Sequence, residues 1–281
     1  AQAYARLGSE VTIIELAARL LPRGDEELSD ILAQTLQAEG VRLELEAEVE
    51  RVSQRDDVKK VELKHGKSID ADALLVAVGR RPRVEPLNLS AANVDYDARG
   101  IKVDRKMRST NKHIYACGDV TGEMPLTHVA ELQAGVIIAN MMFKLPRKIS
   151  YEVVPAVVYT EPEVAQVGLS IEQCEAHKHG AVHRFEVAEL DRAVTDNARS
   201  GVAKILTVKG KVVGAHIIAP HAGELIHELA LAVQQKMHIS KITSLVHAYP
   251  SYSQLNKRVA GQYYKDRLFS RVTKKIVRLL W

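Results

Sequence analysis

The sequence predicts a mixed fold, in which an α/β region with a parallel sheet is followed by an α+β region with an antiparallel sheet. Helix-like and strand-like patterns alternate up to about residue 81. This first region closes with Ala73–Val78, a nearly continuous apolar run of the kind found in parallel strands buried on both faces. After Lys148 the pattern changes to strands joined by short turns and backed by helices. The 281 residues are enough for more than one hydrophobic core.

The first region begins with an amphipathic helix that Gly8 closes, because glycine is favoured just after a helix C-terminus. A β-branched strand follows and ends in the acid Glu15. The next helix is expected at Glu26–Glu39, where apolar residues recur at helical spacing and Gly40 ends the pattern. Further strands are expected at Val41–Leu45, Glu48–Ser53 and Lys59–Leu63, with a turn at Asp56-Asp57 between the last two.

The later elements are expected as follows. A strand-like run, Ile114–Cys117, ends in Gly118-Asp119, and a helix begins near Leu126-Thr127. Beyond Lys148 we expect a strand at Val153–Tyr159 and a helix at Gly223–Met237. Between them, Lys209-Gly210 is a plausible tight hairpin turn, which joins strands at Ala203–Val208 and Lys211–Ile218.

Composition excludes several classes of protein. Hydrophobic residues make up 46% and charged residues 26%, as in ordinary globular chains. No apolar run approaches the roughly 18 residues of a membrane span. The two cysteines, Cys117 and Cys174, form no C-x-x-C motif, so they suggest a reducing, cytoplasmic setting and no metal site, with Cys117 as an inert buried residue. The net charge of +4 with only 5% aromatic residues gives no reason to expect nucleic-acid binding.

Gly118-Asp119 lies between a strand-like run and a helix start, an order that suits a ligand site. A carboxylate at the end of a strand can accept hydrogen bonds from sugar-like hydroxyls, and the N–H groups of a helix N-terminus attract an electron-rich group. Gly118 removes a side chain where a ligand must come close. By itself the dipeptide favours an ordinary turn over a ligand site.

The surrounding text, TNKHIYACGDVTGEMPLTHVAELQAG, resembles the flavin-contacting return segment of the FAD- and NAD(P)-dependent pyridine nucleotide-disulfide oxidoreductases. The resemblance implies that Asp119 binds the ribityl chain of FAD. It also implies that the backbone N–H near Thr127 faces the pyrimidine edge of the flavin. The FAD-binding residues expected from it are Gly118, Asp119, Thr127, His128 and Ala130.

The same resemblance, which runs from Ala1 to about Gly261, implies an NAD site. An acid at the end of the second strand of a dinucleotide-binding unit binds the adenosine ribose, and Glu15 has that place, although a solvated acid at a strand end is the alternative. A carboxylate repels a 2′-phosphate, so NADH is preferred to NADPH, a preference that Arg19 could soften. Gly79 and Arg80 match the family's junction between its NAD and FAD domains.

The resemblance also divides the chain. Residues 1–81 would form a Rossmann-like NAD-binding domain without its first strand and glycine loop, and residues 82–148 the return part of the FAD domain. Residues 149–265 would form the antiparallel-sheet-plus-helices dimerisation domain, and residues 266–281 a basic amphipathic tail. The family's N-terminal FAD half and its redox-active Cys pair are not in the sequence, so we expect a C-terminal piece of a longer protein. Such a piece should bind FAD and NADH weakly, because neither pyrophosphate has its glycine loop.

The segment HAYPSYSQ departs from the family pattern. Members that handle dithiols carry a His before the Pro and a Glu five residues later, and this pair exchanges protons with a thiol. Tyr249 and Gln254 stand at those positions, and a phenol and an amide cannot form such a pair at neutral pH. His247, two residues upstream, is a weak substitute with a structural alternative. The departure favours the mercuric reductase-like branch over lipoamide dehydrogenases, although the vicinal cysteines of mercuric reductases are missing from VRLLW.

Two further groups of residues suggest a binding site but also have a purely structural interpretation. His221, Glu224, His227 and Glu228 could be drawn as a metal site, but their spacing favours a solvated helix start. The tail from Lys265 to Trp281 carries six basic residues and one acid, with Leu268, Val272, Ile276 and Leu279 at helical spacing. Such a helix either contacts an anionic membrane or a partner, or packs on its own domain.

These observations predict an FAD- and NAD(P)H-dependent oxidoreductase, with NADH preferred. It would reduce a disulfide, a metal ion or another small acceptor, act as a homodimer through its C-terminal domain, and be cytoplasmic or membrane-associated. The alternative is a non-catalytic piece that serves only as a dimerisation or interaction module.

Overall fold

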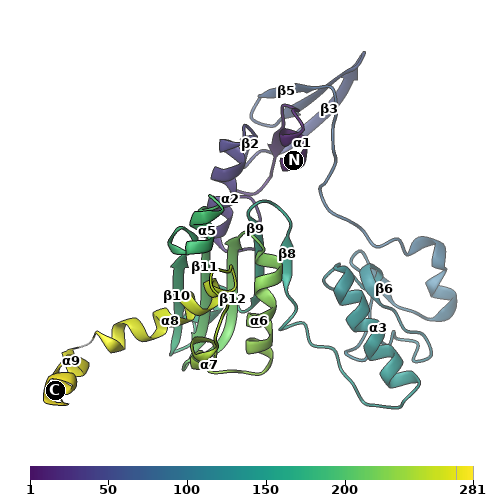
Figure 1. Ribbon diagram of the computed structural model, residues 1–281. Helices are drawn as coiled ribbons and strands as arrows, with labels where there is room; N and C mark the ends of the chain where they lie inside the picture. Colours follow the sequence, from purple (N-terminus) through teal and green to yellow (C-terminus); the bar gives the residue numbers. More distant parts are fainter. Residues whose placement is uncertain (270, 281) are drawn as a thin grey trace. The chain divides into compact units, whose positions relative to one another are not determined.

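A computed structural model describes residues 1–269 and 271–280 (Figure 1). The chain forms two compact units. The first comprises Ala1–Leu74 and Glu152–Trp281, and the second Leu75–Tyr151. Within the described ranges, no helix has the length and apolar character that crossing a membrane requires.

A five-stranded antiparallel sheet is the centre of the first unit, with the order β10-β11-β12-β9-β8. Its hairpin of β11 and β12 turns at Lys209 and Gly210, whose φ angles of 53° and 76° are those of the tight turn predicted for these residues. A Cβ on Gly210 would meet the imidazole ring of His238, so both space and φ favour glycine there. The strands are β8 Ala156–Val158, β9 Glu163–Gly168, β10 Gly180–Glu186, β11 Val202–Val208 and β12 Lys211–Ala219.

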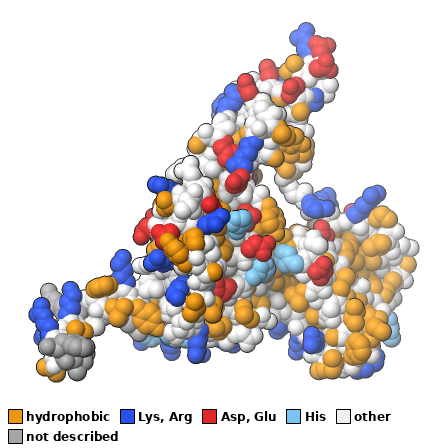
Figure 2. All heavy atoms as spheres, in the orientation of Figure 1, with side chains coloured by type: hydrophobic (Ala, Val, Ile, Leu, Met, Phe, Trp, Pro, Cys, Tyr) orange, Lys and Arg blue, Asp and Glu red, His pale blue; other side chains and the backbone are white. Residues whose placement is uncertain are grey.

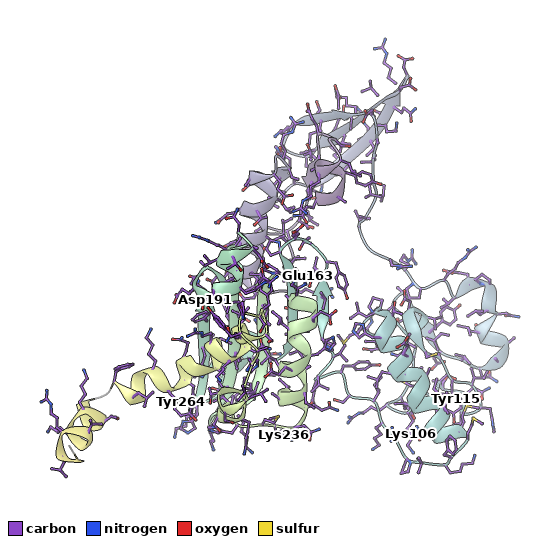
Figure 3. The ribbon with its side chains drawn as sticks, viewed as in Figure 1. Lys106, Tyr115, Glu163, Asp191, Lys236 and Tyr264 are labelled. Carbon is purple, nitrogen blue, oxygen red and sulfur yellow. The ribbon has the colours of Figure 1, made fainter. Side chains whose placement is uncertain are left out.

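Helices cover this sheet and complete its core. α6 (Ala222–Gln234) packs on β9 and β12, and it buries Leu225, Ile226 and Leu229 there. Burying a leucine side chain contributes about 1.5–3 kcal/mol, so this face is a main source of stability. Figure 3 labels Glu163, whose Oε2 accepts a hydrogen bond from the Gly223 N–H at the start of α6 (2.8 Å). The other helical segments are α4 Ile171–Glu175, η4 Val187–Glu189, α5 Asp191–Thr195, α7 Ser240–Ser244, α8 Gln254–Leu268 and α9 Arg271–Leu280.

The N-terminal part of this unit alternates helix and strand, as predicted. β1 pairs in parallel with β2 across helix α2, and a meander of three antiparallel strands follows. The carboxylate of Asp25 caps α2 by accepting a hydrogen bond from the Glu27 N–H (3.0 Å), and the buried face of the helix includes Leu28, Leu32 and Leu36. The last strand of the meander was not predicted. The elements are α1 Gln2–Arg6, β1 Thr12–Ile14, α2 Glu26–Ala38, β2 Arg42–Glu44, β3 Val49–Arg55, β4 Val58–Leu63 and β5 Ser68–Ala71.

A buried charge cluster joins α2 to the five-stranded sheet. Asp25 accepts hydrogen bonds from Lys204 Nζ (2.8 Å) and from His216 Nδ1 (3.0 Å), and all three side chains are buried. The Nε2 of His216 lies 3.1 Å from the Leu169 carbonyl oxygen, so both ring nitrogens face oxygen atoms of the protein. Burial alone would raise the pKa of Asp25, but the hydrogen bonds from His216 and Lys204 lower it to about 2. Glu27 also pairs with Lys204 (2.7 Å).

The second unit is built around helix α3 and several short turns. Its residues include a fully buried Met107 that packs with Val136 of α3 and with Ile149. The helix begins where the sequence predicts. The elements are η1 Glu85–Leu87, η2 Leu89–Ala92, β6 Tyr96–Asp97, β7 Gly100–Ile101, η3 Gly118–Thr121 and α3 Thr127–Met141.

Two predicted strands are wrong. Residues 73–78 form no strand, and their apolar side chains are exposed, up to 93% for Val78. A strand needs a hydrogen-bonded neighbour, and the only described parallel sheet consists of β1 and β2 alone. Residues 114–117 make one isolated bridge, between Tyr115 and Arg108, and the Ile114 N–H closes a local turn on the Asn111 carbonyl (2.9 Å). Cys117, predicted to be buried in that strand, is therefore exposed.

Candidate functional site

The Gly118-Asp119 turn is the centre of the candidate flavin site. It forms the short helix η3, in which Gly118 has a φ of 78° and the Thr121 hydroxyl donates to the Gly118 carbonyl (2.9 Å). The Gly122 N–H closes the turn on the Asp119 carbonyl (3.0 Å). These bonds fix the backbone on both sides of Asp119, while its carboxylate is exposed and can accept hydrogen bonds from a ligand.

A buried glutamine is hydrogen-bonded to the backbone of this turn. Gln133 of α3 is fully buried, and its Oε1 accepts a hydrogen bond from the Gly118 N–H (2.6 Å). Its Nε2 donates to the Tyr151 hydroxyl oxygen (2.9 Å), and burial raises the pKa of Tyr151, which keeps the phenol protonated. Sequence reasoning missed Gln133. The available signal was one amide in the otherwise apolar middle of a predicted helix, where a polar side chain needs a specific partner.

The N-terminus of α3 lies beside the turn. A Cβ built on Gly118 would lie 3.5 Å from the Ala130 Cβ, so the turn and the first helical turn are in contact range. Thr127 and His128 are exposed at this helix start, and the amides of Val129 and Ala130 already bond to the Leu126 carbonyl. The structure therefore brings together the five residues predicted to bind FAD.

Glu15 lies directly after β1, at the carboxyl end of that strand, where the sequence analysis places it. One of its oxygens, Oε1, accepts a hydrogen bond from the Ala17 N–H (2.8 Å), which orients the carboxylate within its loop. Arg19 is directed to the following loop, where its guanidinium approaches the Gly24 carbonyl (3.5 Å) and Glu26 (3.5 Å). The described contacts of the Arg19 guanidinium are thus with residues 22–26.

Gly79 and Arg80, predicted at the nucleotide site, are exposed in the second unit, whereas Glu15 belongs to the first. The φ of Gly79 is 117°, so the chain turns there in a way that only glycine adopts easily. Their part in nucleotide binding stays a prediction.

The C-terminal loop presents Tyr249 and Gln254 in different surroundings. Tyr249 is exposed and precedes a cis peptide bond to Pro250. Gln254 is half-buried and begins α8, with its N–H bonded to the Ser251 carbonyl (3.3 Å). The loop thus offers a phenol to its surroundings in place of the imidazole of dithiol-handling enzymes.

The side chain of His247 is buried within its own domain, whereas that of Tyr249 is exposed. Its buried imidazole lies 3.3 Å from the Glu228 carboxylate of α6 through Nε2 and 3.3 Å from the Leu245 carbonyl oxygen through Nδ1. Asn256 donates to the same Glu228 oxygen (2.8 Å). Both ring nitrogens of His247 therefore face acceptors within its own domain, an arrangement that supports the structural alternative. Glu228 and Asn256 were not linked to His247 in the sequence analysis.

The described residues hold no cluster of three or more His, Cys, Asp or Glu side chains that could bind a metal ion. Glu228, one member of the conceivable metal cluster at the start of α6, is instead paired with His247 and Asn256. Cys174 is buried, and burial raises the pKa of its thiol.

Comparisons with known proteins identify the family of the chain. A family model described as pyridine nucleotide-disulphide oxidoreductase matches residues 1–134, and one for the dimerisation domain of that family matches residues 154–259. Mercuric reductase from Bacillus cereus is 36% identical over 274 residues, which cover 94% of this chain and 43% of that protein. Mitochondrial dihydrolipoyl dehydrogenase from Pisum sativum is 34% identical over 270 residues, or 93% and 54%.

Solved structures give the same result. A Cu(II) complex of the HOCl-induced flavoprotein disulfide reductase RclA from Escherichia coli has a TM-score of 0.87 at 28% identity, and covers 92% of this chain and 60% of its own. LpdA from Mycobacterium tuberculosis has a TM-score of 0.87 at 28% identity, with 93% and 58% covered. The chain spans about half the length of the curated relatives it matches. With two models of one family matching most of its residues, the chain belongs to the pyridine nucleotide-disulphide oxidoreductase family.

Proposed function

We propose that the whole protein is a flavoprotein oxidoreductase that passes electrons from NAD(P)H through FAD to a disulfide, a metal ion or another small acceptor. The observation that carries this proposal is the Gly118-Asp119 turn, held by the buried Gln133 beside the start of α3. These groups fit FAD. An exposed carboxylate can accept hydrogen bonds from the ribityl hydroxyls, and a helix N-terminus favours an electron-rich ring edge. Bound FAD would supply the hydride-accepting ring.

The test measures flavin binding by the whole protein, purified after expression of its complete gene. We expect a yellow protein whose flavin absorbance near 450 nm bleaches on anaerobic addition of NADH. Asp119→Ala should lower flavin occupancy about tenfold, the effect of losing one charge-assisted hydrogen bond. Asp95→Ala, at an equally exposed carboxylate of the same unit, is the matched control. A colourless protein would refute the proposal and favour the non-catalytic module.

The nicotinamide cofactor is proposed to be NADH. Glu15 stands at a strand end and Arg19 is engaged by the 22–26 loop, so the strand end presents a carboxylate to a ribose. Glu15→Ala should therefore narrow the ratio of kcat/KM for NADH over NADPH. An unchanged ratio would show that Glu15 has no part in nucleotide selection.

The acceptor is proposed to be handled without the His–Glu pair of lipoamide dehydrogenases. Tyr249 and Gln254 stand at the positions of that pair. The His247 imidazole contacts the Glu228 carboxylate instead. A thiol partner would thus find no imidazole base in this loop, which favours a mercuric reductase-like chemistry. Of the relatives, one is a mercuric reductase and another a dihydrolipoyl dehydrogenase, so the choice rests on these residues.

We also propose a homodimer formed through the dimerisation domain, which a family model matches at residues 154–259. Large apolar side chains of this domain are exposed, among them Tyr159 at 82% and Val246 at 87%, as expected for a surface that a second copy covers. Light scattering should give about twice the chain mass of 31.1 kDa. Val246→Glu should produce monomers, whereas Val52→Glu, at an exposed apolar residue outside the domain, should not.

The location is proposed to be cytoplasmic, with peripheral contact between the C-terminal tail and a membrane surface. Two free cysteines in the described residues are compatible with a reducing compartment. The tail forms the end of α8 and helix α9. Residues 270 and 281 of the predicted basic amphipathic tail lie outside the described residues.

A further inference from the structure

The positive charge of the protein is concentrated at its C-terminal end. Residues 265–281 hold six of the 39 Lys and Arg residues and one of the 35 Asp and Glu residues. The other 264 residues therefore carry 33 basic and 34 acidic side chains and are nearly neutral. The net charge of +4 is thus a property of one short segment, and Figure 2 shows Lys and Arg side chains gathered over α9.

We name residues 265–280 the C-terminal arm. Its helix α9 has the sequence RVTKKIVRLL, which contains four basic residues and no acid. At about 100° per residue, the four basic positions fall within an arc of roughly 100°, and the apolar positions occupy the rest of the circumference. A helix with one basic face and one apolar face is typical of a segment that lies in a membrane interface.

The four apolar side chains of the arm whose burial the structure describes are exposed. Phe269 is 69% exposed and Leu279 is 89% exposed, and Leu268 and Val277 are exposed as well. The basic side chains of Lys274, Lys275 and Arg278 are also exposed. If the arm packed on its own domain, these apolar side chains would be buried.

We infer that the C-terminal arm binds a membrane surface that carries anionic headgroups. This inference rests on the proposed peripheral membrane contact and names its lipid class. Basic side chains at an anionic leaflet strengthen binding by roughly fivefold each at moderate salt, and the exposed apolar side chains can enter the boundary between headgroups and acyl chains. An acidic protein surface would satisfy the charges but would leave an apolar face on the other side of α9 without a role.

Vesicle sedimentation of the full chain tests this inference. We expect it to pellet with phosphatidylcholine vesicles that contain about 30% phosphatidylglycerol, to pellet far less with phosphatidylcholine alone, and to be released as salt rises from about 0.1 M to about 0.5 M. Lys274→Glu with Lys275→Glu and Arg278→Glu should weaken binding at least about a hundredfold. Phe269→Ser with Leu279→Ser should also weaken it.

The control replaces three exposed lysines outside the arm, Lys112, Lys178 and Lys241, by glutamate, which changes the net charge equally. Equal loss of binding in this control would assign the effect to net charge and overturn the inference. Equal binding to both kinds of vesicle would preserve the peripheral contact but refute the anionic lipid class. No binding to either vesicle would refute both, and retention on immobilised polyglutamate in that case would point to an acidic protein partner.

Discussion

Asparagine at position 25 would remove the negative charge from the buried cluster of Asp25, Lys204 and His216 while keeping the shape of the side chain. Asparagine caps helices about as well as aspartate, so the start of α2 should keep its cap. What changes is the charge. Lys204 would keep Glu27, 2.7 Å away, but the two donors aimed at Asp25 would lose their carboxylate.

The size of the effect follows from two independent routes. Removing one partner of a buried ion pair costs about 3–5 kcal/mol, and the remaining Glu27 places Asp25→Asn at the lower end. A carboxyl whose pKa falls from 3.8 to about 2 on folding contributes about 2.5 kcal/mol at neutral pH. Because the pKa is lowered in the folded state, this contribution is complete above about pH 4 and is lost as the pH falls through about 2.

Urea unfolding followed by circular dichroism measures this difference. At pH 7 the free energy of unfolding of Asp25→Asn should be about 3 kcal/mol below that of the wild type, with an unchanged slope against urea. The gap should narrow as the pH falls from about 4 toward 2, because the Asp25 carboxyl of the unfolded wild type then takes up a proton while that of the folded protein does not. Asp30→Asn, at an exposed carboxylate of the same helix, should change stability by less than about 0.5 kcal/mol. A loss below about 1 kcal/mol at pH 7, or a gap independent of pH, would refute the reasoning.

Three other outcomes are expected. Gln133→Leu should speed hydrogen exchange of the Gly118 amide about tenfold, measured by NMR, and unchanged protection would contradict the hydrogen bond assigned to it. Gly210→Ala should lower the melting temperature by several degrees, because alanine meets both a positive φ and a neighbouring ring; an unchanged value would contradict that contact. In the whole enzyme, Tyr249→His with Gln254→Glu should raise dihydrolipoamide oxidation, and high native turnover with that substrate would contradict the role given to the substitution.

Local sequence signals predicted the elements whose partners are close in sequence. The β11–β12 hairpin needs only its Lys209-Gly210 turn and two apolar runs, and the structure confirms both strands. Helix α2 was predicted from its apolar face and from the stop at Gly40, and the structure adds the N-cap at Asp25. The resemblance to the family likewise depends on contiguous motifs, which the family models confirm.

The contacts that the sequence could not show join residues far apart in the chain. Gln133 reaches back 15 residues to Gly118, and His247 reaches back 19 residues to Glu228. Hydrophobic periodicity reports which face of an element is buried, but it does not report which polar group meets which across a core. The same limit explains why the link between Asp25 and Lys204, separated by 179 residues, was invisible before the structure.

The error at residues 73–78 has a different cause. Apolar composition predicts that a segment will be buried somewhere, but a parallel strand also needs hydrogen-bonded neighbours on the sheet. In the described residues the parallel sheet has only β1 and β2, and the 73–78 segment pairs with neither. Val78 and its apolar neighbours are therefore exposed. The prediction from composition thus describes a tendency of the segment, and the sheet around it decides whether that tendency becomes a strand.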